Sequence, residues 1–305
     1  MRRQADTEKW TTFLRTAGLD SDLAKSWASF ARPNIRLLVE DELAEDTAPP
    51  GATKFGGSPD LPVGTAWPAR PAYAYAKGRR TDVNDPVWSS APLTFIAQVN
   101  LADIARLGSD LPLPTEGLLA FFYDAATQPW GFDPADGVGT CILYTPAGTS
   151  TERLMPPGDG PARTLVATLE PGESLPDWAW LTDRIGRTHQ DIVGELEKLN
   201  DTAYAEMAYA EHAFGGWPAI IQNPLELECQ LASHGIYVGG PQGYQNEQAE
   251  ALIPGATDWR LMLQIDSSDA LGWTWGDVGR LYFMCRNQDI ATHSFDRAWT
   301  ILQCT

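Results

Sequence analysis

Apolar and polar residues alternate with the period of an α-helix over the first 32 positions. Two apolar stripes recur at intervals of three and four residues: Trp10, Phe13, Leu14 and Ala17, then Leu23, Trp27, Phe30 and Ala31. Gly18 suits the left-handed conformation that ends a helix, and Asp20 or Ser21 can cap the next one. The pattern therefore predicts a helical pair that ends at Pro33.

Beyond Pro33 the pattern changes to that of strands and turns. Residues 35–39 predict a strand, and the acidic run 40–46 ahead of Pro49-Pro50-Gly51 predicts a linker. The 27 glycines and 23 prolines are typical of a turn-rich β protein. One long helix is expected to interrupt the strands, because Thr188 and Asp191 resemble a capping box and apolar residues keep helical spacing from there to Ala210.

An internal repeat is the most informative feature of the strand-rich part. Three blocks recur in the same order: residues 55–59 as 214–218, residues 93–100 as 259–266, and residues 117–122 as 279–284. Both copies contain a glycine pair and a glutamine: Gly56-Gly57 with Gln98, and Gly215-Gly216 with Gln264. Three matched blocks in one order predict the duplication of a unit of roughly 70 residues, about 55–124 and 214–286.

The repeat also predicts how each unit folds. Because side chains along a strand alternate between faces, Phe95, Ala97 and Val99 are expected to share one core face, and Leu261, Leu263 and Ile265 the matching one. The two glutamines would point the other way. The two strands end at the potential helix caps Asn100 and Asp266, each followed three residues later by an acid, so a short helix is expected after each strand.

These patterns predict an α+β fold that is mostly β, with short helices and an internally duplicated β-rich domain behind an N-terminal helical pair. The expected division is a helical extension over 1–48 and the duplicated domain over 49–305. The core is expected to contain the large apolar residues of the repeated strands: Phe95, Val99, Leu119, Phe121, Leu261, Ile265, Leu281 and Phe283.

The net charge of the chain limits the kinds of molecule that it can be expected to bind. The chain carries 22 basic and 40 acidic residues, a net charge of −18, which argues against nucleic acid and against an anionic membrane surface. No apolar run reaches the length of a membrane helix, and the first residues lack the apolar stretch of a signal peptide. We therefore expect a cytoplasmic protein whose four widely spaced cysteines are reduced thiols.

Familiar catalytic motifs are absent from the sequence. It contains neither the P-loop pattern nor a G-x-S-x-G elbow, and the single close pair Cys229 and His234 does not predict a zinc site. Asp266 and Asp269 could suggest paired carboxylates, but Asn100 holds the equivalent place in the first copy, so capping is the better interpretation. We predict no catalytic residue, no metal and no cofactor.

Four residues that break the symmetry of the repeat are the candidate ligand-binding residues: His212, Gln222, Trp275 and Asp277. His212 precedes the second glycine pair and could either bond a turn carbonyl or line the mouth of a pocket. Asp277 could be a simple turn residue, or a polar group beside the aromatic platforms of Trp273 and Trp275. Any site is expected in a groove where the two halves meet.

The chain resembles a known bacterial family in several motifs. They are Gly56-Gly57-x-Pro59-x-Leu61-Pro62, Phe95 to Leu101, Gly117 to Phe122, His212 to Pro218 with Gln222, and Trp275 to Gly279 with Phe295-Asp296. Together they are similar to the YwqG-like family, a domain of unknown function, over about residues 51–305. The resemblance implies a mostly β fold with an internal duplication, and it implies no reaction, cofactor or catalytic residue.

Two hypotheses of function remain open at this stage. The first is a non-catalytic binding or interaction module, of which an immunity or antitoxin-type partner of a basic protein is a special case. The alternative is an enzyme of unrecognised class that acts on a small polar or sugar-like ligand in a cleft between the repeats. The expected partner is thus a basic protein or a small polar ligand, and the sequence leaves the oligomeric state open.

Overall fold

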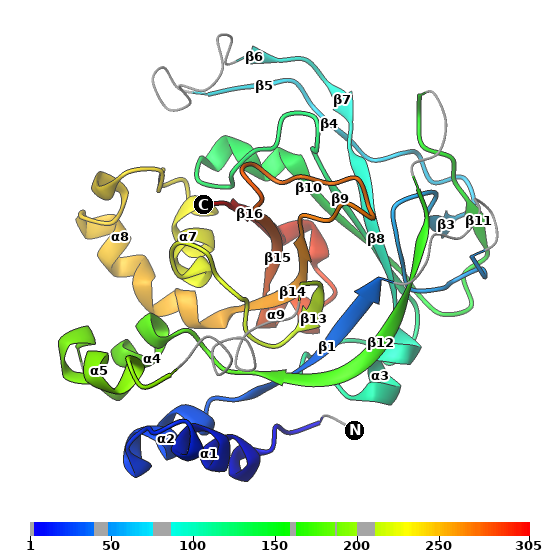
Figure 1. The fold of residues 1–305 in the computed structure, drawn as a ribbon. Helices are drawn as coiled ribbons and strands as arrows, with labels where there is room; N and C mark the ends of the chain where they lie inside the picture. Colours follow the sequence, from blue (N-terminus) through cyan, green and yellow to red (C-terminus); the bar gives the residue numbers. More distant parts are fainter. Residues whose placement is uncertain (1–2, 40–47, 76–86, 159–162, 187, 200–210) are drawn as a thin grey trace.

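The computed structural model describes residues 3–39, 48–75, 87–158, 163–186, 188–199 and 211–305. Within these residues, ten antiparallel strands form one sheet that curls until it is nearly closed (Figure 1). In spatial order the strands are β10 (Thr140–Thr145), β9 (Leu118–Tyr123), β8 (Thr94–Asn100), β2 (Lys54–Phe55), β12 (Leu165–Ser174), β1 (Arg32–Val39), β13 (Ala213–Gly215), β14 (Trp259–Asp266), β15 (Arg280–Arg286) and β16 (Trp299–Gln303). The expectation of a mostly β, α+β fold is confirmed.

Smaller elements surround this sheet. Short strands form two-stranded sheets: β3 (Asp60–Pro62) pairs with β11 (Thr151–Arg153), β4 (Ala69–Arg70) with β7 (Ala91–Pro92), and β5 (Tyr73–Ala74) with β6 (Val87–Trp88). The helices are α1 (Thr7–Thr16), α2 (Ser21–Ala28), α3 (Leu101–Leu107), α4 (Trp178–Ile185), α5 (His189–Leu196), α7 (Leu225–Ala232), α8 (Glu247–Leu252) and α9 (Asn287–Ala291). Short 3-10 helices are η1 (Pro134–Gly139), η2 (Pro241–Gly243), η3 (Ile253–Asp258) and η4 (Phe295–Arg297).

The two glutamines of the repeat occupy equivalent places in the sheet. The Oε1 atom of Gln98 accepts from the Asp60 amide (2.7 Å), and its Nε2 donates to the Ala52 carbonyl (2.9 Å). Gln264 makes the same pair of bonds, from the Ala219 amide (2.8 Å) and to the Glu211 carbonyl (3.4 Å). Each partner stands at the same distance along the chain from the phenylalanine of its glycine turn. The structure thus agrees with the duplication.

The same irregularity interrupts both copies of the repeated strand. The register between β8 and β9 shifts between Phe95 and Ala97, and that between β14 and β15 shifts between Leu261 and Leu263. A β-bulge adds one residue to a strand, so the side chains before the bulge lie on the opposite face of the sheet from the one that simple alternation predicts. Phe95 and Leu261 therefore pack on the outer face, away from Ala97, Leu263 and the rest of the inner cluster. The expectation that each set of three residues shares one face is wrong for this reason.

The two halves exchange their first strands. β1 precedes the first copy in sequence but pairs with β13 of the second, while β12 precedes the second copy and pairs with β2 of the first. Phe214 lies opposite Ile35, and Phe55 lies opposite Leu165, so Ile35 and Leu165 are counterparts. Three residues further on, the counterparts Leu38 and Thr168 face each other across β1 and β12.

A pseudo-two-fold axis therefore passes through the middle of the sheet, between β1 and β12. The counterpart rings of Phe121 and Phe283 also contact each other, with their centroids 5.3 Å apart and nearly perpendicular. All eight expected core residues are buried. The bulge does not expose Phe95 or Leu261, because the outer face of the sheet is also covered.

The expected short helix forms only in the first half. Asn100 caps α3, its Oδ1 accepting from the Ala102 amide at 2.9 Å. After Asp266 the chain instead forms a loop closed by a bridge between Ser268 and Trp273. The Asp266 carboxylate pairs with Arg280 (2.7 Å), so it is engaged across the strands as well as with the next amide, Ser267. The prediction of a helix after Asp266 is therefore wrong.

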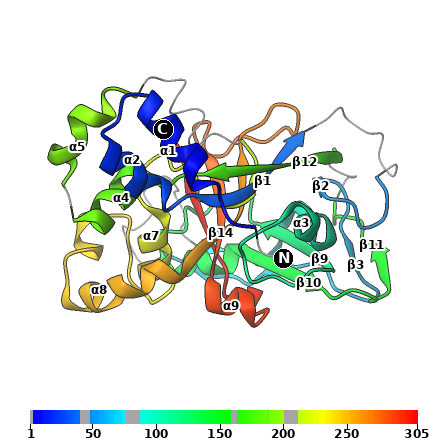
Figure 2. The ribbon, with the colours of Figure 1, turned by 90° about the horizontal axis from the view of Figure 1, so that it is seen from below.

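The N-terminal helices form as expected, with the Asp20 carboxylate accepting from two amides at the start of α2. They pack with α4 and α5 into a separate apolar cluster that includes Trp10, Trp27 and Leu181 (Figure 2). The strand after them begins at Arg32, three residues before the expected start. The division at residue 48 stays a prediction, but β1 lies on its N-terminal side and is nevertheless a central strand.

The capping box of the later helix is also present. The Thr188 amide donates to the Asp191 carboxylate at 2.6 Å, and α5 follows to Leu196. The helix ends at Leu196 and residues 197–199 do not continue it, so the prediction that helical spacing carries on through Leu199 is wrong. Residues 200–210 of the expected helix and the acidic run 40–46 lie outside the described residues. All four cysteines are free thiols. No helix within the described ranges combines the length and apolarity that a membrane span requires.

Candidate functional site

His212 lies inside the molecule, immediately before β13. Its Nδ1 accepts from the Asp266 amide (3.1 Å), and its ring centroid stands 5.1 Å from that of Phe55. Burial, together with the charge of Arg280, lowers the pKa of His212 to about 4, so the ring is neutral near pH 7. A neutral ring that accepts at Nδ1 carries its proton on Nε2, a buried atom for which the described residues supply no acceptor.

Trp275 is a core side chain. Only 1% of its surface is exposed, and its ring meets Tyr123 edge to face at 6.0 Å. Its amide donates to the Ser267 hydroxyl (2.9 Å), which holds the start of the turn against the end of β14. The ring therefore supports the fold from within and does not offer an open platform.

Gln222 and Asp277 both lie at the surface, each bonded to one of the last two residues of the sequence. The side-chain Nε2 of Gln222 donates to the Cys304 carbonyl (2.8 Å), and the Thr305 hydroxyl donates to the backbone carbonyl of Asp277 (3.1 Å). Both Gln222 and Asp277 are exposed. In the part of the chain that the structure describes, the Asp277 carboxylate has no hydrogen-bond partner. The structure thus places two of the four candidate residues beside the same end of the chain and the other two inside.

The turn that carries Asp277, residues 275–279, is held in an unusual conformation. Val278 has a φ of 53°, and 68% of its surface is exposed. A β-branched residue at positive φ is strained, at a cost of about 1–3 kcal/mol. Gln128 braces the turn from the other half, accepting from the Gly276 amide (2.8 Å) and donating to the Thr274 carbonyl (3.1 Å). We call this surface the Trp-Gly-Asp turn.

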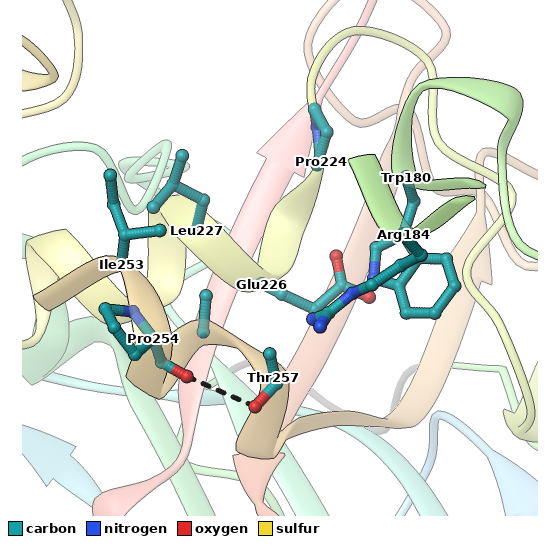
Figure 3. Close-up of a pocket in the computed structure, with 9 residues that line it drawn as sticks. Trp180, Arg184, Pro224, Glu226, Leu227, Ile253, Pro254 and Thr257 are labelled. Atoms are coloured by element: carbon teal, nitrogen blue, oxygen red, sulfur yellow. Dashed lines mark hydrogen bonds between the residues drawn. The ribbon is translucent and has the colours of Figure 1, made fainter. Parts of the chain in front are cut away.

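A cavity of about 330 Å³ lies elsewhere, between α4, α7 and η3 (Figure 3). It is lined by Trp180, Arg184, Pro224, Glu226, Leu227, Ile253, Pro254, Ala256 and Thr257. Most of this lining is apolar, and the Thr257 hydroxyl already donates to the Pro254 carbonyl (3.2 Å). None of the four candidate residues lines the cavity.

Two residues of opposite charge, Glu226 and Arg184, line the cavity. Glu226, in the first turn of α7, is 7% exposed, and its carboxylate accepts a hydrogen bond from its own amide. Arg184 comes from α4 and stands over the ring of Trp180, 5.0 Å from its centroid. Within the described ranges no hydrogen bond or ion pair joins Arg184 to Glu226. Burial raises the pKa of Glu226, against the opposing charges of Arg32 and Arg184.

A row of packed side chains connects this cavity to the second glycine turn. The rings of Trp180 and Trp217 are 4.3 Å apart, and the Arg32 guanidinium lies 3.4 Å from the centre of the Trp217 ring. Trp217 directly follows Gly215-Gly216, and its indole donates to the Phe30 carbonyl (2.6 Å). Burial lowers the pKa of Arg32 to about 9. Trp180 is therefore backed by closely packed side chains.

Sequence reasoning missed the cavity because its residues come from three separate segments with no shared motif. Two local signals were available: Trp180 and Arg184 are four residues apart on one helix, and Glu226 follows Pro224 at a helix start. Neither signal shows that these segments meet. A second cavity, of about 270 Å³, lies beside α3 and is lined by Ile104, Ala105, Ser109, Leu111, Leu113, Pro114 and Thr115, none of them charged.

The described residues define an antiparallel β protein made of two halves with exchanged strands, with a charged cavity against one half. Among them, no three His, Cys, Asp or Glu side chains gather so as to hold a metal ion. The chain belongs to the family described as Domain of unknown function (DUF1963), whose model matches residues 53–304. No curated protein matches the chain.

Proposed function

We propose that this protein is a non-catalytic binding module that recognises a basic protein partner through the Trp-Gly-Asp turn. The observation that carries the proposal is the exposed carboxylate of Asp277, which has no hydrogen-bond partner among the described residues and lies beside the exposed and strained Val278. Backbone strain at a solvent-facing turn is typical of a functional surface. The turn therefore offers a negative charge and an apolar contact on a braced support.

The charge of the whole chain supports the same kind of partner. A net charge of −18 accelerates the approach of a basic protein and disfavours acidic ones. An immunity or antitoxin-type role, in which this protein covers a basic toxin, is the special case of the proposal. The enzyme alternative has weaker support, because Trp275 is packed in the core and cannot stack on a ligand as placed.

Two narrower points belong to this proposal. The motifs shared with the YwqG-like proteins support membership of that subgroup within the wider family. The four free thiols support a reducing compartment, and so a cytoplasmic location.

The test is a titration with a Lys- and Arg-rich peptide that carries interspersed leucines, followed by amide chemical shifts and calorimetry. Asp277→Asn is expected to weaken binding severalfold with little change in the melting temperature, because no described residue forms a hydrogen bond or ion pair with the carboxylate. Asp269→Asn removes the same charge from another exposed loop and is the matched control.

Equal weakening by both variants would show that only net charge matters, and the proposal would fail. The proposal also fails if Asp277→Asn lowers the melting temperature while binding is unchanged, since Asp277 would then be a turn residue only. Shifts confined to residues 275–279 and the adjacent C-terminal residues are the expected result.

A further inference from the structure

We propose that the cavity between α4, α7 and η3 binds a free amino acid with an apolar side chain, held as a zwitterion between Glu226 and Arg184. This site is separate from the Trp-Gly-Asp turn and does not depend on the proposed function. Its starting point is the pair of opposite charges that line one cavity (Figure 3), with no hydrogen bond or ion pair between them in the described part of the chain.

Glu226 is the acceptor for the ammonium group of the ligand. The carboxylate is more than nine-tenths buried, and its hydrogen bond within the described residues is to its own amide. A buried carboxylate with unused acceptor positions is costly, and a charged donor in the cavity would satisfy it. The Arg32 and Arg184 charges nearby balance Glu226 at a distance but occupy none of these positions.

Arg184 is the donor for the carboxylate of the ligand. Its guanidinium is positioned by the Trp180 ring, and within the described ranges no hydrogen bond or ion pair engages it. A guanidinium presents a planar set of donors that matches a carboxylate. The residue is exposed, so the carboxylate end of the ligand lies toward the mouth of the cavity and the ammonium end deeper.

The charges of the site disfavour the simpler ligands. A plain cation would approach Glu226 but would be repelled by Arg184 and Arg32, and a plain anion would meet the carboxylate of Glu226. A zwitterion satisfies both groups and brings no net charge into a largely apolar cavity. Electrostatic complementarity of this kind gives specificity more than affinity.

The remaining walls account for the side chain of the ligand. Leu227, Ile253 and Pro254 line the cavity on the side away from Trp180 (Figure 3), and Ile253 is 46% exposed. The volume of about 330 Å³ is at the lower end of the range for ligand sites, so it suits one amino acid. An aromatic or branched apolar side chain would cover Ile253 and stack against Trp180.

The experiment is calorimetric titration of the full chain with L-leucine, L-phenylalanine and L-tryptophan at millimolar concentrations. N-acetyl-phenylalanine, which lacks the ammonium group, and phenylalanine amide, which lacks the carboxylate, are titrated in parallel. Saturable binding is expected for at least one free amino acid, with each blocked form weaker by about tenfold or more, since charge-assisted bonds contribute about that much.

Variants test the two residues separately. Glu226→Gln and Arg184→Gln are each expected to weaken binding of the free amino acid by about tenfold or more. Glu226→Gln should not further weaken the binding of N-acetyl-phenylalanine, which lacks the ammonium group. Arg184→Gln should not further weaken the binding of phenylalanine amide, which lacks the carboxylate. Glu250→Gln and Arg106→Gln change the same charges at exposed positions outside the cavity and should bind as the parent does.

Amide chemical shifts show that each variant is folded before it is titrated. The absence of saturable binding by all three amino acids would overturn the proposal, as would equal binding of the free and blocked forms. Loss of binding in the two control variants would do the same. None of these outcomes bears on the binding of a basic peptide at the Trp-Gly-Asp turn, so the two proposals can fail independently.

Discussion

At the scale of single residues, the second glycine of each glycine pair makes room for the exchanged strand. A Cβ at Gly216, where φ is 78°, would lie 2.7 Å from the Cβ of Asn34, which belongs to β1. A Cβ at the counterpart Gly57 would collide with Thr164, the residue immediately before β12. Asn34 and Thr164 are themselves counterparts across the pseudo-two-fold axis. The glycine pairs thus serve both a turn and a close approach between the halves.

Gly216→Ala is therefore expected to lower the free energy of unfolding by roughly 2 kcal/mol or more, through positive φ and steric overlap together. Gly64→Ala is the control, because its φ is 82° but no atom of the described residues lies within 4 Å of the added carbon. The control should cost about 1 kcal/mol, the backbone contribution alone. Urea unfolding measures both, and equal losses would contradict the close approach at Gly216.

Glu228 is a second residue whose environment predicts a measurable property. It is 1% exposed and accepts from Asn223 (3.2 Å) and Gln303 (3.3 Å). Burial raises its pKa to about 8 from the ordinary 4.5, against the opposing effect of these hydrogen bonds. Because the folded pKa is the higher one, the stability it contributes is complete below pH 4.5 and is lost as the pH rises through 8.

Glu228→Gln should flatten the dependence of unfolding free energy on pH across this window, by up to about 1.4 kcal/mol per pH unit. Urea unfolding at several pH values between these limits measures the slope, whatever the change in absolute stability. Glu250→Gln, an exposed change on α8, should leave the slope as it is. If the unfolding free energies of Glu228→Gln and the parent changed with pH in parallel, Glu228 would be ionised in the folded protein and the prediction would be wrong.

At the scale of elements, each repeated strand is tied to its glycine loop by one glutamine side chain. Gln98 and Gln264 are almost completely buried, and each satisfies one amide and one carbonyl that lie outside the main sheet ladder. Each repeated strand has few backbone hydrogen bonds on the side that faces its two- or three-residue partner, whereas its other side is paired along most of its length. The glutamine supplies the missing connection in both halves.

Gln98→Ala and Gln264→Ala are each expected to cost about 1–3 kcal/mol, because each leaves a buried amide without an acceptor. Gln248→Ala, at an exposed position of α8, should change stability by less than about 0.5 kcal/mol. Thermal and urea unfolding of the three variants measure the comparison. A small effect at either buried glutamine would contradict the structural equivalence of the two.

At the scale of the whole molecule, the exchange of β1 and β12 makes each half depend on the other. β1 lies between β12 and β13, so the segment ahead of the family match completes the sheet. The N-terminal helices are tied to the same region, since the Trp10 indole donates to Glu173 of β12 (2.9 Å). The two halves are therefore expected to unfold together.

Deletion of residues 1–39 should abolish the native fold, because it removes a central strand and leaves β12 and β13 unpaired on one side. Deletion of residues 1–18 removes α1 alone and should leave a folded protein with a lower melting temperature. Near-ultraviolet circular dichroism and amide chemical-shift dispersion distinguish the two cases. A folded protein lacking residues 1–39 would mean that the domain starting near residue 49 is independent of β1.

Local pattern in the sequence was enough for several parts of this structure. Helical spacing and capping residues predicted α1, α2 and the start of α5, because these depend on neighbours within one turn. The repeat predicted two equivalent strand units, since duplicated residues retain the same packing and hydrogen bonds. The burial of the large residues in these strands also followed from their apolar character.

Other features were decided by contacts between segments far apart in the chain. The bulge that turns Phe95 and Leu261 outward arises from strand pairing, and the missing helix after Asp266 arises from its pairing with Arg280. The exchange of β1 and β12 and the meeting of Arg184 with Glu226 in one cavity also depend on tertiary packing. Alternation along one strand carries no information about its partner, so only the folded arrangement determines these features.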